Sequence, residues 1–265
     1  MYEFNYHRPE SVAEARQLFT ELEDPSFLAG GHTLLPSMKQ RLAAPSDLID
    51  LSAIADLSGI KEADGEIVIG AMTCHDDVAT STIVASGIPA LAKLAGGIGD
   101  AQVRNRGTIG GSVTNADPAA DYPAGLLGLG ARVRTTVGEI PADEFFMGMF
   151  ETALPEGELL EAVIFPVPES SVYMKFPNPA SRYATVGVFV AKTADGIRVA
   201  ITGASPSAFR WHEAEAALMS DFSAGAIAGL SLSASGMNDD LHASAEYRAH
   251  LCSVMTRRAV ADLAG

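Results

Sequence analysis

Two glycine pairs restrict the fold of this chain more than any other feature of its sequence. Gly30-Gly31 follows a short apolar stretch and precedes a segment, ending near Arg41, that is predicted to be helical. Gly110-Gly111 lies within residues 108–121. Because glycine has no Cβ atom, each pair lets an anionic oxygen approach successive backbone N–H groups closely. Both stretches are therefore predicted to bind an anionic ligand, and the helix start after the first adds partial positive charge.

Polar side chains accompany these glycines. Hydroxyl donors are supplied by Thr33, Thr108, Ser112 and Thr114. Asp121 is a candidate for binding the hydroxyl groups of a sugar or a ribityl chain. A third glycine-rich stretch, residues 96–99, follows a predicted helix, whereas the dinucleotide-binding fingerprint follows a strand. The pattern thus favours an anion site that is not of the Rossmann type.

The sequence nominates neither a catalytic residue nor a metal ligand. The motifs G-x-S-x-G and H-E-x-x-H and the phosphate-binding loop of nucleoside triphosphatases are absent, and no nucleophile–base pair can be identified. Cys74 and Cys252 lie far apart and outside any C-x-x-C pair, which excludes a zinc finger or an iron–sulfur protein. If this protein handles electrons, the metal centres are expected on other chains.

Composition narrows the class of protein further. The net charge is −15, from 33 acidic and 18 basic residues, which argues against a nucleic-acid partner. No apolar run approaches the roughly 20 residues that span a bilayer. The first ten residues lack the basic and then apolar pattern of a signal peptide. We therefore expect a cytoplasmic protein that is not an integral membrane protein.

Local patterns predict mixed helices and strands in the N-terminal part. Ser11 and Glu14 form a capping box that begins a helix ending near Leu22. Short strands are expected over residues 26–29 and 47–51, so the first fifty or so residues form a small α/β unit. Asp64-Gly65 and Asp195-Gly196 separate β-branched segments and predict hairpins with type I′ turns, whose central residues need positive φ.

The remaining patterns predict where the chain divides. Helices are expected over residues 88–94, 121–129 and 244–264, and a strand pair over residues 132–140. The proline-rich residues 165–171 predict a domain boundary, because the strands after it are followed by helices in an α+β order. The expected domains are residues 1–168 and 169–265.

Several of these segments together resemble a known family. The segments AGGHTLLPSMKQRLA and RNRGTIGGSVTNADPAADYPA are similar to the paired FAD-binding loops of the flavoprotein (medium) subunits of the molybdenum hydroxylases. The similarity extends to YHRPESVAEA, GELLEAVIFPVP, KFPNPASRYATVGV and YRAHLCSVMTRRAV. Within the family, the chain most resembles the medium subunits of aerobic carbon monoxide dehydrogenases, which are related to the FAD domain of xanthine dehydrogenase.

The resemblance implies a fold. An FAD-binding domain of the p-cresol-methylhydroxylase type, with two α/β subdomains at about residues 1–55 and 56–168, would precede a C-terminal α+β domain with an antiparallel sheet.

It also implies the residues that bind FAD. Two stretches would surround the pyrophosphate, namely Ala29, Gly30, Gly31, His32, Thr33 and Leu34, and Thr108, Ile109, Gly110, Gly111 and Ser112. Thr114, Asp117 and Asp121 would follow the ribityl and adenosine path. Ile98 and Leu160 would pack near the flavin rings. Lys175 would lie near the pyrimidine end, where a cation stabilises negative charge, and Tyr183 would lie against the isoalloxazine.

Two positions distinguish this chain within the resemblance. A Gly-Gly-His sequence occurs in some flavin oxidases that attach FAD covalently, but the matching subfamily binds FAD without a covalent bond, so we expect none at His32. Ser112 stands where the family usually has Asn, and it lacks the reach and the second polar atom of the Asn amide.

The function that follows is electron transfer. The chain would hold FAD non-covalently, take electrons from a [2Fe-2S] small subunit and pass them to an external acceptor. A large subunit with the molybdenum cofactor would oxidise the substrate. Two other readings stay open: a stand-alone flavin reductase of the UDP-N-acetylenolpyruvoylglucosamine reductase type, and a non-catalytic assembly subunit.

Overall fold

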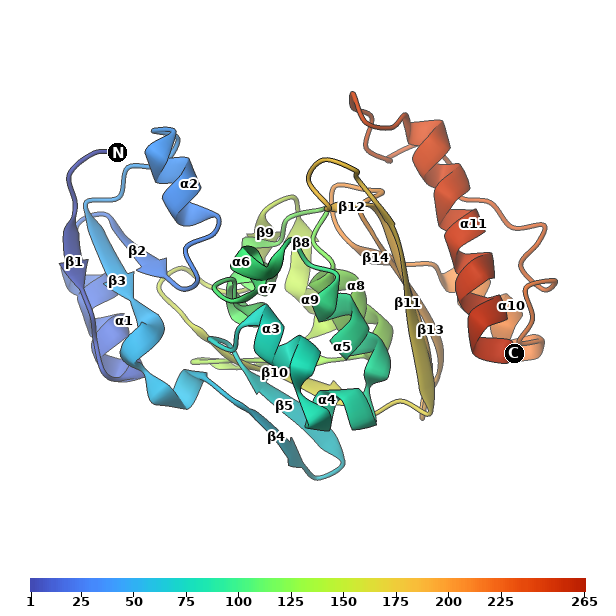
Figure 1. Cartoon of the computed structure of the whole chain (residues 1–265), viewed down its shortest axis with the longest axis horizontal. Coiled ribbons are helices and arrows are strands. Elements are labelled where there is room, and N and C mark those ends of the chain that lie inside the picture. Colours follow the sequence, from blue (N-terminus) through green and yellow to red (C-terminus); the bar gives the residue numbers. More distant parts are fainter.

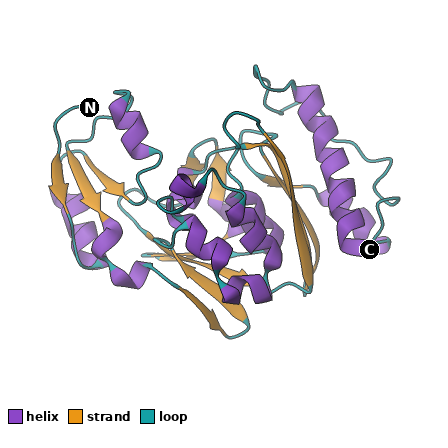
Figure 2. Cartoon of the chain, viewed as in Figure 1, coloured by secondary structure: helices purple, strands orange, loops and turns teal.

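The computed structural model describes all 265 residues, which form three sheets with covering helices and a small hairpin (Figures 1 and 2). Three layers of the chain follow one another from the N-terminus to the C-terminus, and Figure 1 shows them side by side along the longest axis. None of the helices is both long and apolar enough to cross a membrane.

The first layer is a three-stranded parallel sheet with the order β1-β3-β2. Its elements are β1 (Asn5–His7), α1 (Val12–Glu21), β2 (Pro25–Leu28), α2 (Leu34–Lys39) and β3 (Asp47–Asp50), followed by 3₁₀ turns at Leu51–Ala53 and Ala55–Leu57. The capping box is present in shifted form. Ser11 Oγ accepts from the N–H of Glu14 (3.2 Å), whereas the Glu14 carboxylate accepts from the N–H of Glu10 (2.9 Å), one residue before the cap.

The second layer is a five-stranded antiparallel sheet with the order β4-β5-β10-β6-β7. Its strands are β4 (Ile60–Ala63), β5 (Glu66–Gly70), β6 (Arg132–Thr135), β7 (Gly138–Pro141) and β10 (Leu160–Pro166). A separate hairpin is formed by β8 (Phe146–Gly148) and β9 (Glu151–Thr152). The accompanying helices are α3 (His75–Thr80), α4 (Thr82–Gly87), α5 (Pro89–Gly96), α6 (Ala101–Arg104), α7 (Ile109–Asn115), α8 (Tyr122–Leu129) and α9 (Ala142–Phe145).

The third layer is the antiparallel meander β11 (Ser170–Pro177), β12 (Ala184–Thr193), β13 (Gly196–Thr202) and β14 (Phe209–Arg210), with α10 (His212–Ser220) and α11 (Ala245–Ala264) on one face. Helices α5 and α8 contact the other face. The order of strands and then helices confirms the α+β fold expected here. Leu251, Met255 and Val260 of α11 are buried in the core between helix and sheet.

Helix α8 joins the second and third layers. All eight of its residues are buried, because it lies between the two sheets. One continuous core therefore contains Leu91 of α5, Leu126 of α8 and Phe189 of β12. A helix that is apolar on every side can exist in water only when it is covered on every side, so the meander is as much a part of this core as the second layer.

The two Asp-Gly pairs behave differently. Asp64 and Gly65 have φ values of 54° and 78°, as a type I′ turn requires, and they connect β4 to β5. At the second hairpin Thr193 pairs with Gly196, which leaves Ala194 and Asp195 as the turn residues. Neither has a positive φ, so the hairpin is confirmed but the prediction of a type I′ turn there is wrong. The ladder between β12 and β13 places Gly196 in the strand.

Candidate functional site

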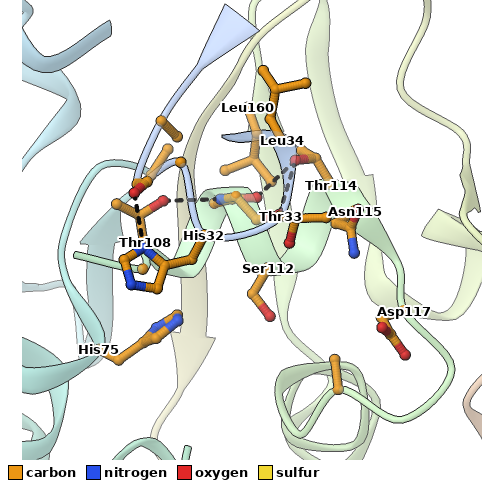
Figure 3. Close-up of a pocket in the computed structure, with 18 of the residues that line it drawn as sticks. His32, Thr33, Leu34, His75, Thr108, Ser112, Thr114, Asn115, Asp117 and Leu160 are labelled. Atoms are coloured by element: carbon orange, nitrogen blue, oxygen red, sulfur yellow. Dashed lines mark hydrogen bonds between the residues drawn. The ribbon is translucent and has the colours of Figure 1, made fainter. Parts of the chain in front are cut away.

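A cavity of about 700 Å³ lies where the first layer meets the second, and 34 residues line it. It brings the two glycine stretches together although they are far apart in the sequence (Figure 3). The contact between them is close. A Cβ atom on Gly30 would collide with the carbonyl oxygen of Arg106 and would lie 2.8 Å from Cα of Gly107. Glycine is therefore required at residue 30 for the two stretches to meet.

Most of the predicted site residues line this cavity. They are Ala29, Gly30, Gly31, His32, Thr33, Leu34, Ile98, Thr108, Gly110, Gly111, Ser112, Thr114, Asp117, Asp121, Leu160 and Tyr183. Ile109 and Lys175 do not line it. The Ile109 side chain is fully buried in the core of the second layer, and Lys175 is paired with Asp121.

The first glycine stretch carries unused hydrogen-bond donors. The backbone N–H groups of residues 30 to 34 donate to no acceptor within the chain. The loop is held open by other contacts. Gly31 has a φ of 71°, and the carbonyl oxygen of Gly30 contacts Nδ1 of His32 (3.1 Å). Successive free N–H groups in a loop with a left-handed residue form a concave anion site, and the prediction for this stretch thus has a structural basis.

The second glycine stretch is different, because it is folded as the helix α7. Thr108 caps the helix, and its Oγ1 accepts from the N–H of Gly111 (3.1 Å). The N–H groups of Ile109, Gly110 and Ser112 donate to the carbonyl oxygens of Thr73, Ala71 and Thr108 respectively, at 3.0, 2.8 and 3.0 Å. The expectation that this stretch also offers a run of free N–H groups is therefore wrong.

Glycine at residue 110 has a packing role. A Cβ atom there would lie 2.6 Å from Cβ of Ala71 and 2.7 Å from its carbonyl oxygen. Helix α7 can thus approach the end of β5 only without a side chain at this position. Gly111 lies on the cavity side, where an added Cβ would be 2.9 Å from Thr108 Oγ1. The two glycines of this pair serve different purposes.

The side chains of α7 that line the cavity differ in what they can offer. Thr114 Oγ1 already donates to the carbonyl oxygen of Gly110 (2.9 Å). Ser112 lies in the middle of the cavity wall in Figure 3. Asn115, at the end of α7, also lines the cavity, and the sequence reasoning missed it. Its position in the T-N-A-D segment beside Thr114 is the signal by which it could have been found.

Asp121 and Lys175 form a buried ion pair. Lys175 Nζ donates to Asp121 Oδ2 at 2.9 Å and to the carbonyl oxygen of Gly97 at 3.2 Å. The hydroxyl group of Tyr173 donates to the other carboxylate oxygen. Burial raises the pKa of Asp121, and Lys175 and Tyr173 oppose that effect. The carboxylate is thus held by two partners inside the protein, so it meets a ligand only with its remaining lone pairs.

The cavity mouth carries Asp117 and Tyr183. Burial raises the pKa of Asp117, whose Oδ1 accepts from the N–H of Ala119 (2.8 Å). Tyr183 is 47% exposed and ends a tight loop from β11 to β12. Within that loop the N–H of Asn178 donates to the carbonyl oxygen of Tyr183, and Arg182 has a φ of 64°. The backbone of this loop thus places Tyr183 where its side chain lines the cavity.

A histidine that the sequence reasoning missed also lines the cavity. His75 begins α3, next to the glycine stretches in space, and it is buried. Burial lowers its pKa to about 4. No motif surrounds it in the sequence, so only the tertiary structure reveals it.

Comparison with known proteins agrees with this geometry. Residues 2–168 match a family described as the FAD binding domain in molybdopterin dehydrogenase, and residues 171–263 match the CO dehydrogenase flavoprotein C-terminal domain. The carbon monoxide dehydrogenase medium chain of Hydrogenophaga pseudoflava is 37% identical, covering 97% of this chain and 96% of its own length. The glyceraldehyde dehydrogenase medium chain of Sulfolobus acidocaldarius is 32% identical, covering 99% of both chains.

The solved structures agree as well. A chain in the reconstituted CO dehydrogenase from Oligotropha carboxidovorans superposes with a TM-score of 0.90 at 35% identity, covering 98% of both chains. The fold and the cavity thus define an FAD-binding flavoprotein. The chain belongs to the FAD-binding medium subunits of the molybdenum hydroxylase family, which are subunits of oxidoreductases. Within this family it is similar to the medium subunits of the carbon monoxide dehydrogenases. The family and the fold expected from its sequence segments are confirmed.

Proposed function

We propose that this chain is the electron-transfer subunit of a molybdenum hydroxylase complex. It would bind FAD non-covalently, receive electrons from a [2Fe-2S] small subunit and deliver them to an external acceptor, while a large subunit with the molybdenum cofactor oxidises the substrate. The complex would work in the cytoplasm. The observation that carries this proposal is the run of unpartnered N–H groups at residues 30–34, which faces a cavity in an FAD-binding fold.

The cavity fits the cofactor in size and chemistry. Its volume lies within the range of small-molecule and cofactor sites. The free donors suit the pyrophosphate, which is the anionic part of FAD. Gly111 and Ser112 form the facing wall, and the absence of a Cβ at residue 111 leaves room for the phosphate oxygens. Because the protein as a whole is acidic, these local donors have to supply the attraction.

Bound FAD would supply the reversible uptake of electrons, and the chain would supply binding, orientation and exclusion of water. Ile98 and Leu160 would contact the flavin rings from the cavity walls, and Tyr183 would cover them at the mouth. Lys175 would act on the pyrimidine end only through Asp121, because its ammonium group is paired with that carboxylate. No residue of this chain need act as a general acid or base.

We also propose the domain division of residues 1–168, with subdomains at about 1–55 and 56–168, and residues 169–265. The cavity lies at the junction of the two subdomains, and the C-terminal domain contributes Tyr183 to its mouth. Because one core continues from the second layer into the meander, we expect the two domains to unfold together.

The test begins with the flavin. Protein co-expressed with its neighbouring subunits should be yellow, should release FAD and not FMN on acid precipitation, and should copurify with molybdenum and iron. Colour that stays with the precipitate would indicate a covalent bond at His32. A flavin-containing protein that purifies without partner subunits would support the stand-alone reductase, and a colourless complex would support the assembly subunit.

A matched pair of glycine variants tests the anion loop. Gly31 and Gly65 have similar φ values, 71° and 78°. Alanine costs each backbone about the same strain, of the order of 1 kcal/mol. Only Gly31 lies at the cavity, where the added Cβ would be 2.8 Å from Leu35 Cδ1. Gly31→Ala should lose most of its FAD, and Gly65→Ala should retain it. Equal flavin contents would contradict the assignment of the pyrophosphate to this loop.

A further inference from the structure

His75 occupies an unusual position for a buried histidine. Its backbone N–H donates to the carbonyl oxygen of Gly107 (3.0 Å), in the segment that leads into the second glycine stretch. This pairing places the side chain at the wall of the cavity, beside His32 in Figure 3. The residue is only 4% exposed, so its ring is part of the protein interior on every side except the cavity.

The ring has unused hydrogen-bonding capacity. Nδ1 is fully enclosed and has no partner, and no residue of the chain contacts Nε2 by a hydrogen bond. The hydroxyl group of Tyr122 is likewise enclosed without a partner. The two rings lie against each other, with centroids 5.4 Å apart and planes at 47°. Nε2 is not among the enclosed atoms, so it is the nitrogen that a ligand in the cavity can reach. Buried polar side chains are almost always paired in folded proteins, so the unpaired Nε2 of this buried ring indicates a partner that comes from outside the chain.

Gly107 keeps the Nε2 edge of the ring free. A Cβ atom on Gly107 would lie 2.7 Å from Nε2 and 3.2 Å from the carbonyl oxygen of Val103. The φ of Gly107 is not in the left-handed region, so the backbone conformation does not require glycine here. Glycine is required because the His75 ring leaves no space for a Cβ atom. Gly107 lines the same cavity as His75, and a larger residue would cover the nitrogen that faces it.

The imidazole is neutral at physiological pH. Burial is the main cause that lowers the pKa of His75, and electrostatic repulsion from the nearby His32 and Arg104 side chains adds to it. A neutral imidazole has one donor nitrogen and one acceptor nitrogen. Because Nδ1 is enclosed without a partner, the tautomer that carries the proton on Nε2 lets the ring donate toward the cavity. The nitrogen on the cavity side is then a donor.

We propose that His75 is a cofactor-binding residue, whose Nε2–H donates a hydrogen bond to an oxygen of the bound FAD. This inference rests on the proposed function, because it assumes that FAD fills the cavity. The acceptor can be an oxygen of the pyrophosphate or an oxygen of the riboflavin part. Both are hydrogen-bond acceptors, and the choice of ligand in the test distinguishes them.

The test compares variants of His75 that keep or remove the donor. We expect His75→Leu to bind FAD roughly tenfold more weakly, as the loss of one buried hydrogen bond to the ligand predicts. His75→Gln retains an N–H donor at similar reach and should recover most of the affinity.

Dissociation constants are measured by flavin fluorescence on the complex depleted of FAD, with FAD and ADP as the two ligands. A loss of affinity for both ligands in His75→Leu assigns the acceptor to the pyrophosphate. A loss for FAD alone assigns it to the riboflavin part. If His75→Leu does not fold, His75→Asn replaces it. Its amide has a shorter arm than that of Gln, so it should bind FAD as weakly as expected for the leucine variant.

The outcomes separate this inference from the proposed function. Failure of the wild-type complex to bind FAD would overturn both. Normal FAD binding by the wild type together with equal affinity in His75→Leu, or in His75→Asn where that variant is used, would overturn only the role of His75. Equal affinities of the Leu and Gln variants, both weaker than the wild type, would also overturn it, because a packing role does not distinguish a side chain that donates from one that cannot.

Discussion

Gly30 packs against the carbonyl group of Arg106 so closely that the first glycine stretch and the segment before the second are in backbone contact. The two residues are far apart in the sequence and belong to different layers of the fold. This contact limits the distance between the free N–H groups of residues 30–34 and α7, which both line the cavity. The geometry of the cavity therefore depends on it.

Gly30→Ala should separate the two stretches. Overpacking of this kind costs about 1–3 kcal/mol, and we expect a loss of that size in the free energy of unfolding together with loss of FAD. Urea denaturation and flavin content measure the two effects. Gly229→Ala is the control, because nothing lies within 4 Å of a Cβ there. A Gly30→Ala protein with wild-type stability and a full complement of flavin would refute the role of this contact.

Lys175→Met should destabilise the protein strongly. It leaves the Asp121 carboxylate buried, with its partner ammonium group removed, and breaking such a pair costs about 3–5 kcal/mol. The Lys175 side chain is 12% exposed, so water can compensate little. The double variant Lys175→Met/Asp121→Asn should recover much of the loss, because no unpaired charge remains. Urea denaturation of the single and double variants at pH 7 gives the coupling, and additive effects would argue against a functional ion pair.

Stability should fall as the pH is lowered from about 6.5 to about 4, in part because of His75. Its pKa in the folded protein is about 4, against 6.5 for an unperturbed histidine. In this window the unfolded chain binds a proton that the folded protein does not, so the unfolded state is stabilised relative to the folded state as the pH falls. The full difference corresponds to roughly 3 kcal/mol.

The contribution of His75 is isolated by comparing variants. Carboxylates also titrate in this window, but they are the same in the wild type and in His75→Leu. Between pH 7 and pH 4.5 the free energy of unfolding should therefore decrease more for the wild type than for the leucine variant. A difference that stays constant with pH would mean that His75 is not neutral in the folded protein.

Ser112→Asn should tighten FAD binding. Ser112 lines the cavity, and Asn provides both a carbonyl and an NH₂ group on a longer arm. One added hydrogen bond to a charged group contributes about 1.5–3 kcal/mol, so the Kd should fall roughly tenfold or more. Ser112→Ala serves as the control and should bind no more tightly than the wild type. Weaker binding by the Asn variant would show that the larger side chain is not accommodated.

Much of the fold was determined by local sequence. Asp64-Gly65 forms its predicted turn because both residues tolerate a positive φ. Ser11 caps α1 and Ser244 caps α11 through hydrogen bonds within one turn of helix. Signals of this kind need no distant partner, and they can be read from the sequence alone. The predicted type I′ turn is absent at Asp195-Gly196 because distant pairing outweighs the local signal there. The ladder between β12 and β13 sets the register and puts Gly196 into the strand.

The free N–H groups of the first glycine stretch were also predictable from the sequence, because a glycine pair after a strand limits the backbone directly. Only the tertiary structure decided the rest of the site. The N–H groups of α7 are used because β5 ends beside that helix and supplies the carbonyl oxygen of Ala71. Lys175 is withdrawn from the cavity because Asp121, 54 residues away, is buried next to it. His75 lines the cavity because its backbone pairs with Gly107. Hydrogen bonds and ion pairs between distant segments depend on how the layers pack, and no local pattern in the sequence encodes that packing.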